Sequence, residues 1–120
     1  MDKKTLGLKA EKIAENYLKK RGYKIIKRNF SAHPWGEIDI IAKKKDLVLF
    51  VEVKALTKVN WTKPWEKVNK DKQQKIKRSA FVYLNSFGRE GESYRFDVIS
   101  VEFNKDNSVN NIDHIEGAFE

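Results

Sequence analysis

Apolar and polar positions follow two different periods along this chain, and each change of period marks a new element. Apolar side chains recur every three or four residues over Thr5–Arg21 and again over Lys70–Ser86, which predicts two amphipathic helices. Shorter apolar segments predict strands. These segments are Tyr23–Asn29, Glu37–Ala42, Leu47–Lys54, Ser93–Phe103 and an edge segment, Asn111–Ile115. The predicted order is helix, three strands, helix, then one or two strands.

The residues at the predicted helix ends agree with these boundaries. Gly22 follows three basic residues and suits the left-handed position that closes a helix. Asn69 precedes the second helix and is a residue type that caps helix N-termini, and Gly88 follows its last apolar position. The sequence therefore predicts two well-delimited helices.

A short polar connection, residues 43–46, separates the second and third predicted strands, which should pair as an antiparallel hairpin. The nearly continuous apolar run 47–51 predicts a central strand. Residues 55–68 lack a clean period and are interpreted as a functional loop. With no repeat and no low-complexity linker, the 120 residues are expected to form a single α/β domain, 1–120, whose mixed β-sheet is flanked by helices.

Composition narrows the classes of function. The chain has 25 Lys plus Arg against 17 Asp plus Glu, a net charge of +8, which favours a polyanionic partner. The apolar stripes read as core faces, so nucleic acid is expected rather than a membrane. There is no cysteine, which excludes disulfides and thiolate metal sites, and no apolar leader or span is evident, so a cytoplasmic protein is expected.

One strand ends in a charged pair on an otherwise apolar face. Side chains alternate along a strand, so Glu52 and Lys54 share a face. If the hairpin closes with an even number of unpaired residues, Asp39 of the neighbouring strand joins them. Two carboxylates held close on a half-buried sheet repel each other, and either a shared proton or a bound cation relieves the repulsion.

Mg²⁺ or Mn²⁺ suits such a site. A hard divalent ion takes carboxylate oxygens from Asp39 and Glu52, and the backbone carbonyl of Val53 is a further candidate ligand. Phosphate oxygens and waters are its usual remaining partners, and phosphodiester hydrolysis uses both. The Lys54 ammonium is a candidate for stabilising the charge of the transition state. The alternative is that Glu52 and Lys54 are an ordinary surface ion pair at a strand end.

Two further charged residues lie on helical stripes. Glu11 borders the apolar stripe of the first helix, and helical geometry alone favours a solvated charge. Lys72 lies on the stripe of the second helix within its first turn, where it opposes the helix dipole. It either contacts bound phosphate or lays its stem over the core with its ammonium in water.

Aromatic and basic residues alternate in the predicted loop: Lys58, Trp61, Lys63, Trp65 and Lys67. Such a segment is typical of a nucleic-acid surface, where aromatic rings stack on bases and lysines contact phosphates, although packing as a lid is an alternative. His33 and His114 have no partner at metal-ligand spacing, so neither is assigned a metal.

An ordered set of motifs resembles one known family over nearly the whole chain. The motifs are Gly7-x-x-Ala10-Glu11, Gly22-Tyr23, Arg28-Asn29, Gly36-Glu-Ile-Asp-Ile-Ile-Ala42, Phe50-Val-Glu-Val-Lys54, Lys72 and Arg95-Phe-Asp-Val-Ile99. With these motifs the chain resembles the YraN-like predicted endonucleases, which are related to archaeal Holliday junction resolvases. The resemblance implies a restriction-endonuclease-like fold with a PD-(D/E)xK-type site.

The resemblance also implies roles for particular residues. Asp39, Glu52 and Lys54 would be the metal and catalytic residues, and Glu11 would be a helix-borne acidic partner, which reverses its interpretation from geometry. One position departs from the family, since Leu56 stands where a basic residue often follows the motif lysine. The expected function is a Mg²⁺- or Mn²⁺-dependent endonuclease acting on branched or structured DNA, as a homodimer. A non-catalytic nucleic-acid-binding module and a protein-interaction scaffold are the competing interpretations.

Overall fold

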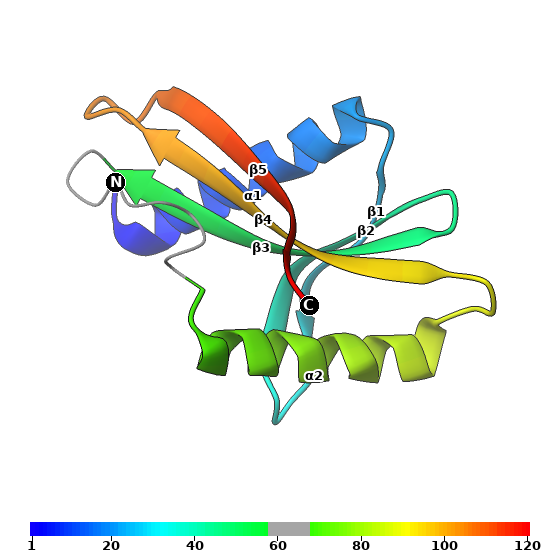
Figure 1. The fold of residues 1–120 in the computed structure, drawn as a ribbon. Coiled ribbons are helices and arrows are strands. Elements are labelled where there is room, and N and C mark those ends of the chain that lie inside the picture. The colour runs from blue at the N-terminus through cyan, green and yellow to red at the C-terminus, as the bar shows by residue number, and fades with distance from the viewer. Residues whose placement is uncertain (58–67) are drawn as a thin grey trace.

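The computed structural model describes residues 1–57 and 68–120. In chain order its elements are α1 (Lys3–Lys20), β1 (Lys24–Ser31), β2 (Glu37–Lys44), β3 (Leu47–Thr57), α2 (Lys70–Phe87), β4 (Ser93–Phe103) and β5 (Val109–Phe119). This order is the predicted one, with the optional last strand present. Figure 1 shows a twisted sheet with the two helices packed against different parts of it.

The sheet is mixed. In the described residues its strand order is β1-β2-β3-β4-β5, so β3 is central as predicted. Strands β3 and β4 are parallel and are joined through α2, whereas the other neighbouring pairs are antiparallel. The β2–β3 hairpin is confirmed, and its last pair, Lys44 with Leu47, leaves two residues unpaired in the turn. The even number places odd positions of β2 opposite even positions of β3.

Side-chain and glycine caps fix the helix ends. The Asp2 carboxylate accepts a hydrogen bond from the Thr5 amide at 2.7 Å, so α1 begins two residues before the predicted start. Gly22 has φ of +91°, which confirms the predicted left-handed position after α1. Asn69 caps α2, as predicted, by accepting from the Lys72 amide at 2.9 Å.

Several predicted strand ends were wrong by a few residues. Strand β3 continues to Thr57 because it pairs in parallel with β4 as far as Phe103, so residues 55–57 are strand rather than loop. Strand β5 covers Val109–Phe119 and not only Asn111–Ile115, because β4 offers it a partner along nearly its whole length. Tertiary pairing extended both strands beyond their local pattern.

The sheet has a core on each face. The α1 residues Leu6, Ala10, Ala14 and Leu18 pack with alternate residues of β2, β3 and β4 on one face. The α2 residues Ile76, Ala80 and Tyr83 pack on the other face with Phe50, Phe96 and their neighbours. Within the described residues, neither helix is long and apolar enough to cross a lipid bilayer.

Strands β2 and β3 separate part-way along their length. Their ladder ends at the pair Ile40 and Val51, while β2 begins at Glu37 and β3 continues to Thr57. Strand β2 instead stays with β1, and both bend away from β3 toward α2 (Figure 1). Asn29 of β1 adopts a left-handed conformation (φ 53°) at this bend. The divergence opens a fork between β2 and β3, and Asp39 lies in it.

Candidate active site

At the fork, the side chain of Asp39 accepts a hydrogen bond that a main-chain carbonyl would accept in a continuous ladder. Its Oδ2 accepts a hydrogen bond from the Val53 amide at 2.8 Å, beyond the last ladder pair. The amide and carbonyl of one strand residue point to the same side, so the Val53 carbonyl also faces β2. The side chain of Asp39 therefore fixes its own position against β3 and lies beside a main-chain oxygen.

Asp39 and Glu52 are two carboxyl groups that interact closely at the fork. Burial, a hydrogen bond with Glu52 and the negative charge of Glu52 together raise the pKa of Asp39 to about 8. The Val53 amide and the positive charge of Lys72 act in the opposite direction. At neutral pH the carboxyl group of Asp39 is therefore mostly protonated.

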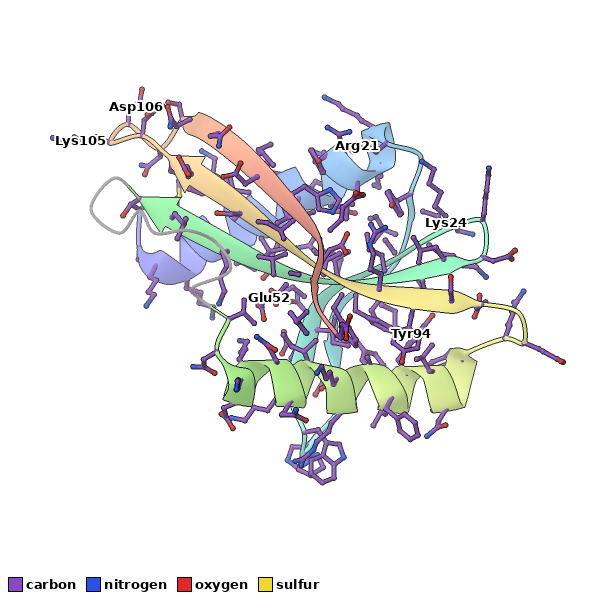
Figure 2. All side chains as sticks on the ribbon, in the orientation of Figure 1. Arg21, Lys24, Glu52, Tyr94, Lys105 and Asp106 are labelled. Carbon is purple, nitrogen blue, oxygen red and sulfur yellow. The ribbon has the colours of Figure 1, made fainter. Side chains whose placement is uncertain are left out.

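Lys72 reaches Glu52 from the second helix. Glu52 is buried, with 7% of its side chain exposed, on the strand face that α2 covers. The Lys72 ammonium lies 3.5 Å from Glu52 Oε2, and the Lys72 side chain is 45% exposed. Figure 2 shows Glu52 between the sheet and α2. The sequence left two alternatives for Lys72, a phosphate contact or an ammonium in water. In the structure the Lys72 ammonium instead contacts Glu52 of the acidic pair.

Lys54 stands two residues beyond Glu52 on β3 and pairs with Ser100 of β4 in the ladder. It is partly buried. In the described parts of the chain, no carboxylate lies within 4.0 Å of its ammonium. The lysine is thus adjacent to the pair without being neutralised by it, which is the arrangement that a role toward substrate charge requires.

The structure does not bring Glu11 to this pair. Its Oε1 accepts from Arg28 at 3.2 Å, and Arg28 also donates to Glu15 at 3.0 Å, so α1 and β1 are linked by an acid–arginine–acid bridge. Within residues 1–57 and 68–120, no group of three His, Asp or Glu side chains has the geometry of a metal site. The structure thus places Asp39 beside Glu52 and the Val53 main chain, without a third acidic side chain from the described residues.

The other predicted residues fall in two groups. The loop positions Lys58, Trp61, Lys63, Trp65 and Lys67 lie outside the described residues. Leu56 is buried, with 3% exposed, so at this position the chain has a packed apolar residue in place of a basic one.

One network of buried charges was missed from the sequence. Asp97 is fully buried in β4 and accepts from Arg95 at 2.8 Å and from the Gly117 amide at 3.0 Å, and His114 Nε2 lies 2.7 Å from its Oδ2. Burial raises the pKa of Asp97, but these hydrogen bonds outweigh it and hold the pKa below its usual range. An aspartate within the apolar run of β4 was the available signal.

The pKa of Asp39 gives the protein a specific dependence of stability on pH. An aspartate in the unfolded chain has a pKa near 3.9, so between about pH 4 and pH 8 the folded state binds more protons than the unfolded state. The contribution of Asp39 to stability is fully present below about pH 4 and is lost as the pH rises toward 8. Asp39→Asn keeps the acceptor for Val53 and gains a permanent donor for Glu52. We expect it to raise the Tm by at least about 5 °C near pH 8 and by less near pH 5.

Differential scanning calorimetry across this pH range measures the effect. Asp46→Asn in the β2–β3 turn removes the same charge from an exposed position and is the matched control, expected to leave the Tm unchanged. An Asp39→Asn protein that is less stable than the wild type at every pH would show that Asp39 is an ordinary ionised structural residue.

The geometry defines a class: an α/β protein with a closely interacting acidic pair, a flanking lysine and a second lysine from a helix, all at a fork in a mixed sheet. The chain belongs to the family described as "Uncharacterised protein family UPF0102", whose model matches residues 10–101. The matched region contains Asp39, Glu52, Lys54 and Lys72.

The relatives are similar over nearly their full length. A UPF0102 protein of Caldanaerobacter subterraneus is 45% identical over 120 residues, which cover 99% of this chain and 98% of the relative. A UPF0102 protein of Clostridium acetobutylicum is 45% identical over 117 residues, covering 98% and 95%. One from Desulfosudis oleivorans is 48% identical over 103 residues, covering 86% and 82%.

Proposed function

We propose that this protein is a Mg²⁺- or Mn²⁺-dependent endonuclease that hydrolyses phosphodiester bonds of DNA, with branched or otherwise structured DNA as its substrate class. The observation that carries the proposal is the acidic pair at the fork: Asp39 accepts from the Val53 amide at 2.8 Å, and the neighbouring residue Glu52 is buried with the Lys72 ammonium 3.5 Å away. Two carboxyl groups held together away from bulk water destabilise a fold unless a proton or cation joins them, so a functional site is the best explanation for keeping them.

The donor set fits a hard divalent cation. Asp39, Glu52 and the Val53 carbonyl would hold it, all through oxygen, and three protein ligands leave positions for phosphate and water. When bound, such an ion supplies Lewis acidity toward a phosphate oxygen and acidifies water.

The two lysines have different roles in this proposal. Lys54, which no carboxylate neutralises in the described residues, donates to the phosphate as negative charge develops on it in the transition state. Lys72 neutralises Glu52 in the free protein. A bound cation would take over that neutralisation, which frees the Lys72 ammonium to contact a backbone phosphate of the DNA.

The proposal extends to the finer fold class and the assembly. The element order α-β-β-β-α-β-β, with the acidic pair on β2 and β3, supports a restriction-endonuclease-like fold. The net charge of +8 supports DNA as the partner, with Lys58, Trp61, Lys63, Trp65 and Lys67 as further DNA contacts. Cleavage of two strands of a junction would use a symmetric homodimer.

A non-catalytic nucleic-acid-binding module is the second candidate. It is favoured by one observation: Glu11 is engaged by Arg28, so only two carboxylates of the described chain meet at the fork. Such a module would bind DNA in a salt-dependent manner without turning it over.

The test is a cleavage panel with duplex, single-stranded, flap and four-way-junction DNA, each with Mg²⁺, with Mn²⁺ and with a chelator. The proposal expects metal-dependent cleavage with branched DNA as the best substrate. Salt-sensitive binding of every substrate without metal-dependent cleavage would favour the binding module instead.

A further inference from the structure

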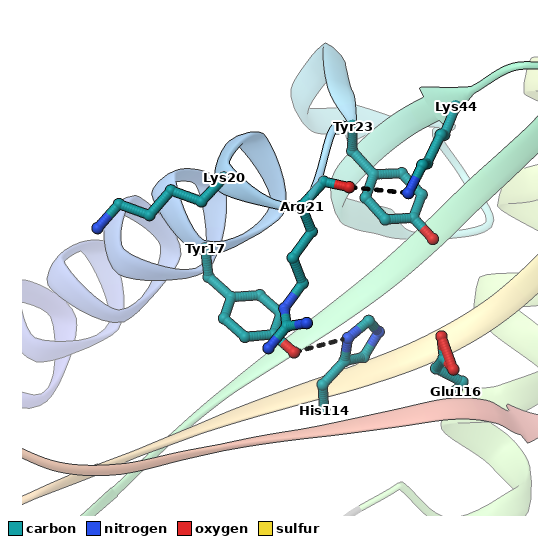
Figure 3. Close-up of a pocket in the computed structure, with 7 residues that line it drawn as sticks. All are labelled: Tyr17, Lys20, Arg21, Tyr23, Lys44, His114 and Glu116. Carbon is teal, nitrogen blue, oxygen red and sulfur yellow. Dashed lines mark hydrogen bonds between the residues drawn. The ribbon is translucent and has the colours of Figure 1, made fainter.

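A polar cavity lies away from the acidic pair, at the C-terminal end of α1. It has a volume of about 490 Å³, within the range of about 300–1,000 Å³ that is usual for small-ligand sites. Its lining residues come from α1, the turn after it, β2 and β5: Tyr17, Lys20, Arg21, Tyr23, Lys44, His114 and Glu116. Figure 3 shows these side chains around the opening, with Lys20 pointing outward from its rim.

Cations dominate this lining. Lys20, Arg21 and Lys44 are basic, and Glu116 is the single acidic residue among the lining side chains. Arg95 donates to Glu116 at 3.2 Å, so that carboxylate already has a partner. In the described segments, no carboxylate lies within 4.0 Å of the three basic groups. Arg21 and Lys44 lie close together without an acidic partner within that distance among the described residues, so their positive charges repel each other, and an anion placed between them removes the repulsion.

Two of the cations are held in place by the fold. The Arg21 guanidinium stacks over the Tyr17 ring at 4.3 Å from its centroid. The Lys44 ammonium donates to the Arg21 carbonyl at 2.9 Å and lies 5.3 Å from the centroid of Tyr23. These contacts reduce the side-chain entropy that a ligand would otherwise have to remove.

Gly22 lies between α1 and the cationic cluster. Its φ of +91° disfavours any other residue, so glycine here serves the end of α1. Lys44 Cε lies 3.4 Å from the position of a Cβ at Gly22, an ordinary contact distance, so Lys44 packs directly over the end of the helix.

The opposite wall is equally fixed. His114 Nε2 lies 2.7 Å from Oδ2 of the buried Asp97, and its Nδ1 forms a hydrogen bond with the Tyr17 hydroxyl at 3.1 Å. Tyr17 also packs edge-on against the His114 ring. Asp97 contacts His114, His114 contacts Tyr17, and the Arg21 guanidinium stacks on the Tyr17 ring. Through these contacts the buried Asp97 of β4 sets the position of a cation at the mouth of the cavity.

We propose that this cavity is a binding site for a phosphate group, held by Arg21 and Lys44 with Lys20 at the rim. Phosphate fits because its oxygens accept several charge-assisted hydrogen bonds at once, and a guanidinium presents a planar pair of donors to them. The group can come from a free nucleotide or from the backbone of a nucleic acid, and both present the same chemistry. The site is independent of the acidic pair at the fork.

Calorimetric titration of the full-length protein at low salt tests the proposal. The probes are inorganic phosphate, adenosine monophosphate, adenosine and a short DNA duplex. The Arg21→Gln/Lys44→Gln double variant is compared with Lys4→Gln/Lys105→Gln, which removes the same charge from exposed positions at the other end of α1 and in the β4–β5 turn. We expect the phosphate-bearing probes to bind more tightly than adenosine, and the cavity double variant to bind at least about tenfold more weakly than the control.

The probes distinguish the sources of phosphate. Saturable binding of adenosine monophosphate that only the cavity variant weakens supports a free nucleotide, whereas a selective loss of duplex affinity supports a nucleic-acid backbone. If both double variants lost the same affinity for the phosphate-bearing probes, the loss would follow from net charge alone, and the proposal would be overturned. Adenosine binding as tightly as adenosine monophosphate would also overturn it. Circular dichroism of both variants shows whether each is folded, and Arg21→Lys should restore part of the affinity.

Discussion

Asp39→Asn and Glu52→Gln are each expected to slow single-turnover cleavage of a four-way DNA junction by a factor on the order of 10³. Each substitution keeps the shape of the side chain and removes one negative oxygen from the cation ligands. The DNA affinity in the absence of metal should stay close to that of the wild type. Asp39 is already protonated at neutral pH, and in Glu52→Gln the loss of the neighbouring charge lets Asp39 ionise in place of Glu52, so neither substitution changes the charge of the metal-free pair. Rapid-quench kinetics, together with filter binding in a chelator, measures the two quantities separately.

Matched substitutions make this result specific. Asp46→Asn and Glu90→Gln remove the same charges from exposed positions and should cleave at the wild-type rate. Wild-type rates for Asp39→Asn and Glu52→Gln in a protein that cleaves would mean that the active site lies elsewhere. A parallel loss of DNA affinity and cleavage would point to a binding surface rather than to a catalytic pair.

Lys54→Met is expected to reduce the rate of the chemical step by a factor on the order of 10² to 10³ while metal affinity stays close to that of the wild type. The ammonium is not a cation ligand, and in the described residues no carboxylate neutralises it. Its contribution therefore falls on charge that develops in the transition state. Single-turnover rates at saturating Mn²⁺ isolate that step from metal binding.

The control for Lys54→Met is Lys24→Met, an exposed strand lysine in β1. It removes the same charge from another strand and should retain the wild-type rate. If Lys54→Met lowered metal affinity and left the rate at saturation intact, Lys54 would act by positioning the acidic pair rather than by contacting the phosphate.

The fold was largely predictable because its elements follow local rules. Helical spacing, the cap at Asn69 and the left-handed Gly22 located both helices, and the short polar connection predicted the β2–β3 hairpin, although not its register. The ends of β3 and β5 were not predictable, because they depend on how far β4 extends beside each of them. Local patterns contain no information about that pairing.

The site was predictable in part. The spacing of Glu52 and Lys54 predicted that they share a strand face, whereas the position of Asp39 depended on the number of unpaired residues in the turn, which the sequence left open. The fork itself was not predictable, since it arises where β2 leaves β3 to follow β1. The hydrogen bond from the Val53 amide to Asp39, the contact of Lys72 with Glu52 and the pairing of Glu11 with Arg28 are all long-range consequences of that divergence.

The most direct test of the central claim, that Asp39 and Glu52 bind a divalent cation, is calorimetric titration of Mn²⁺ into the wild type and into Asp39→Asn. Near pH 7 the pair carries one proton, so binding should release about one proton. The measured enthalpy should therefore change with the ionisation enthalpy of the buffer. The account predicts one saturable site with proton release in the wild type and severely weakened binding in Asp39→Asn. Absence of saturable binding in the wild type, or equal affinity in the two proteins, would contradict it.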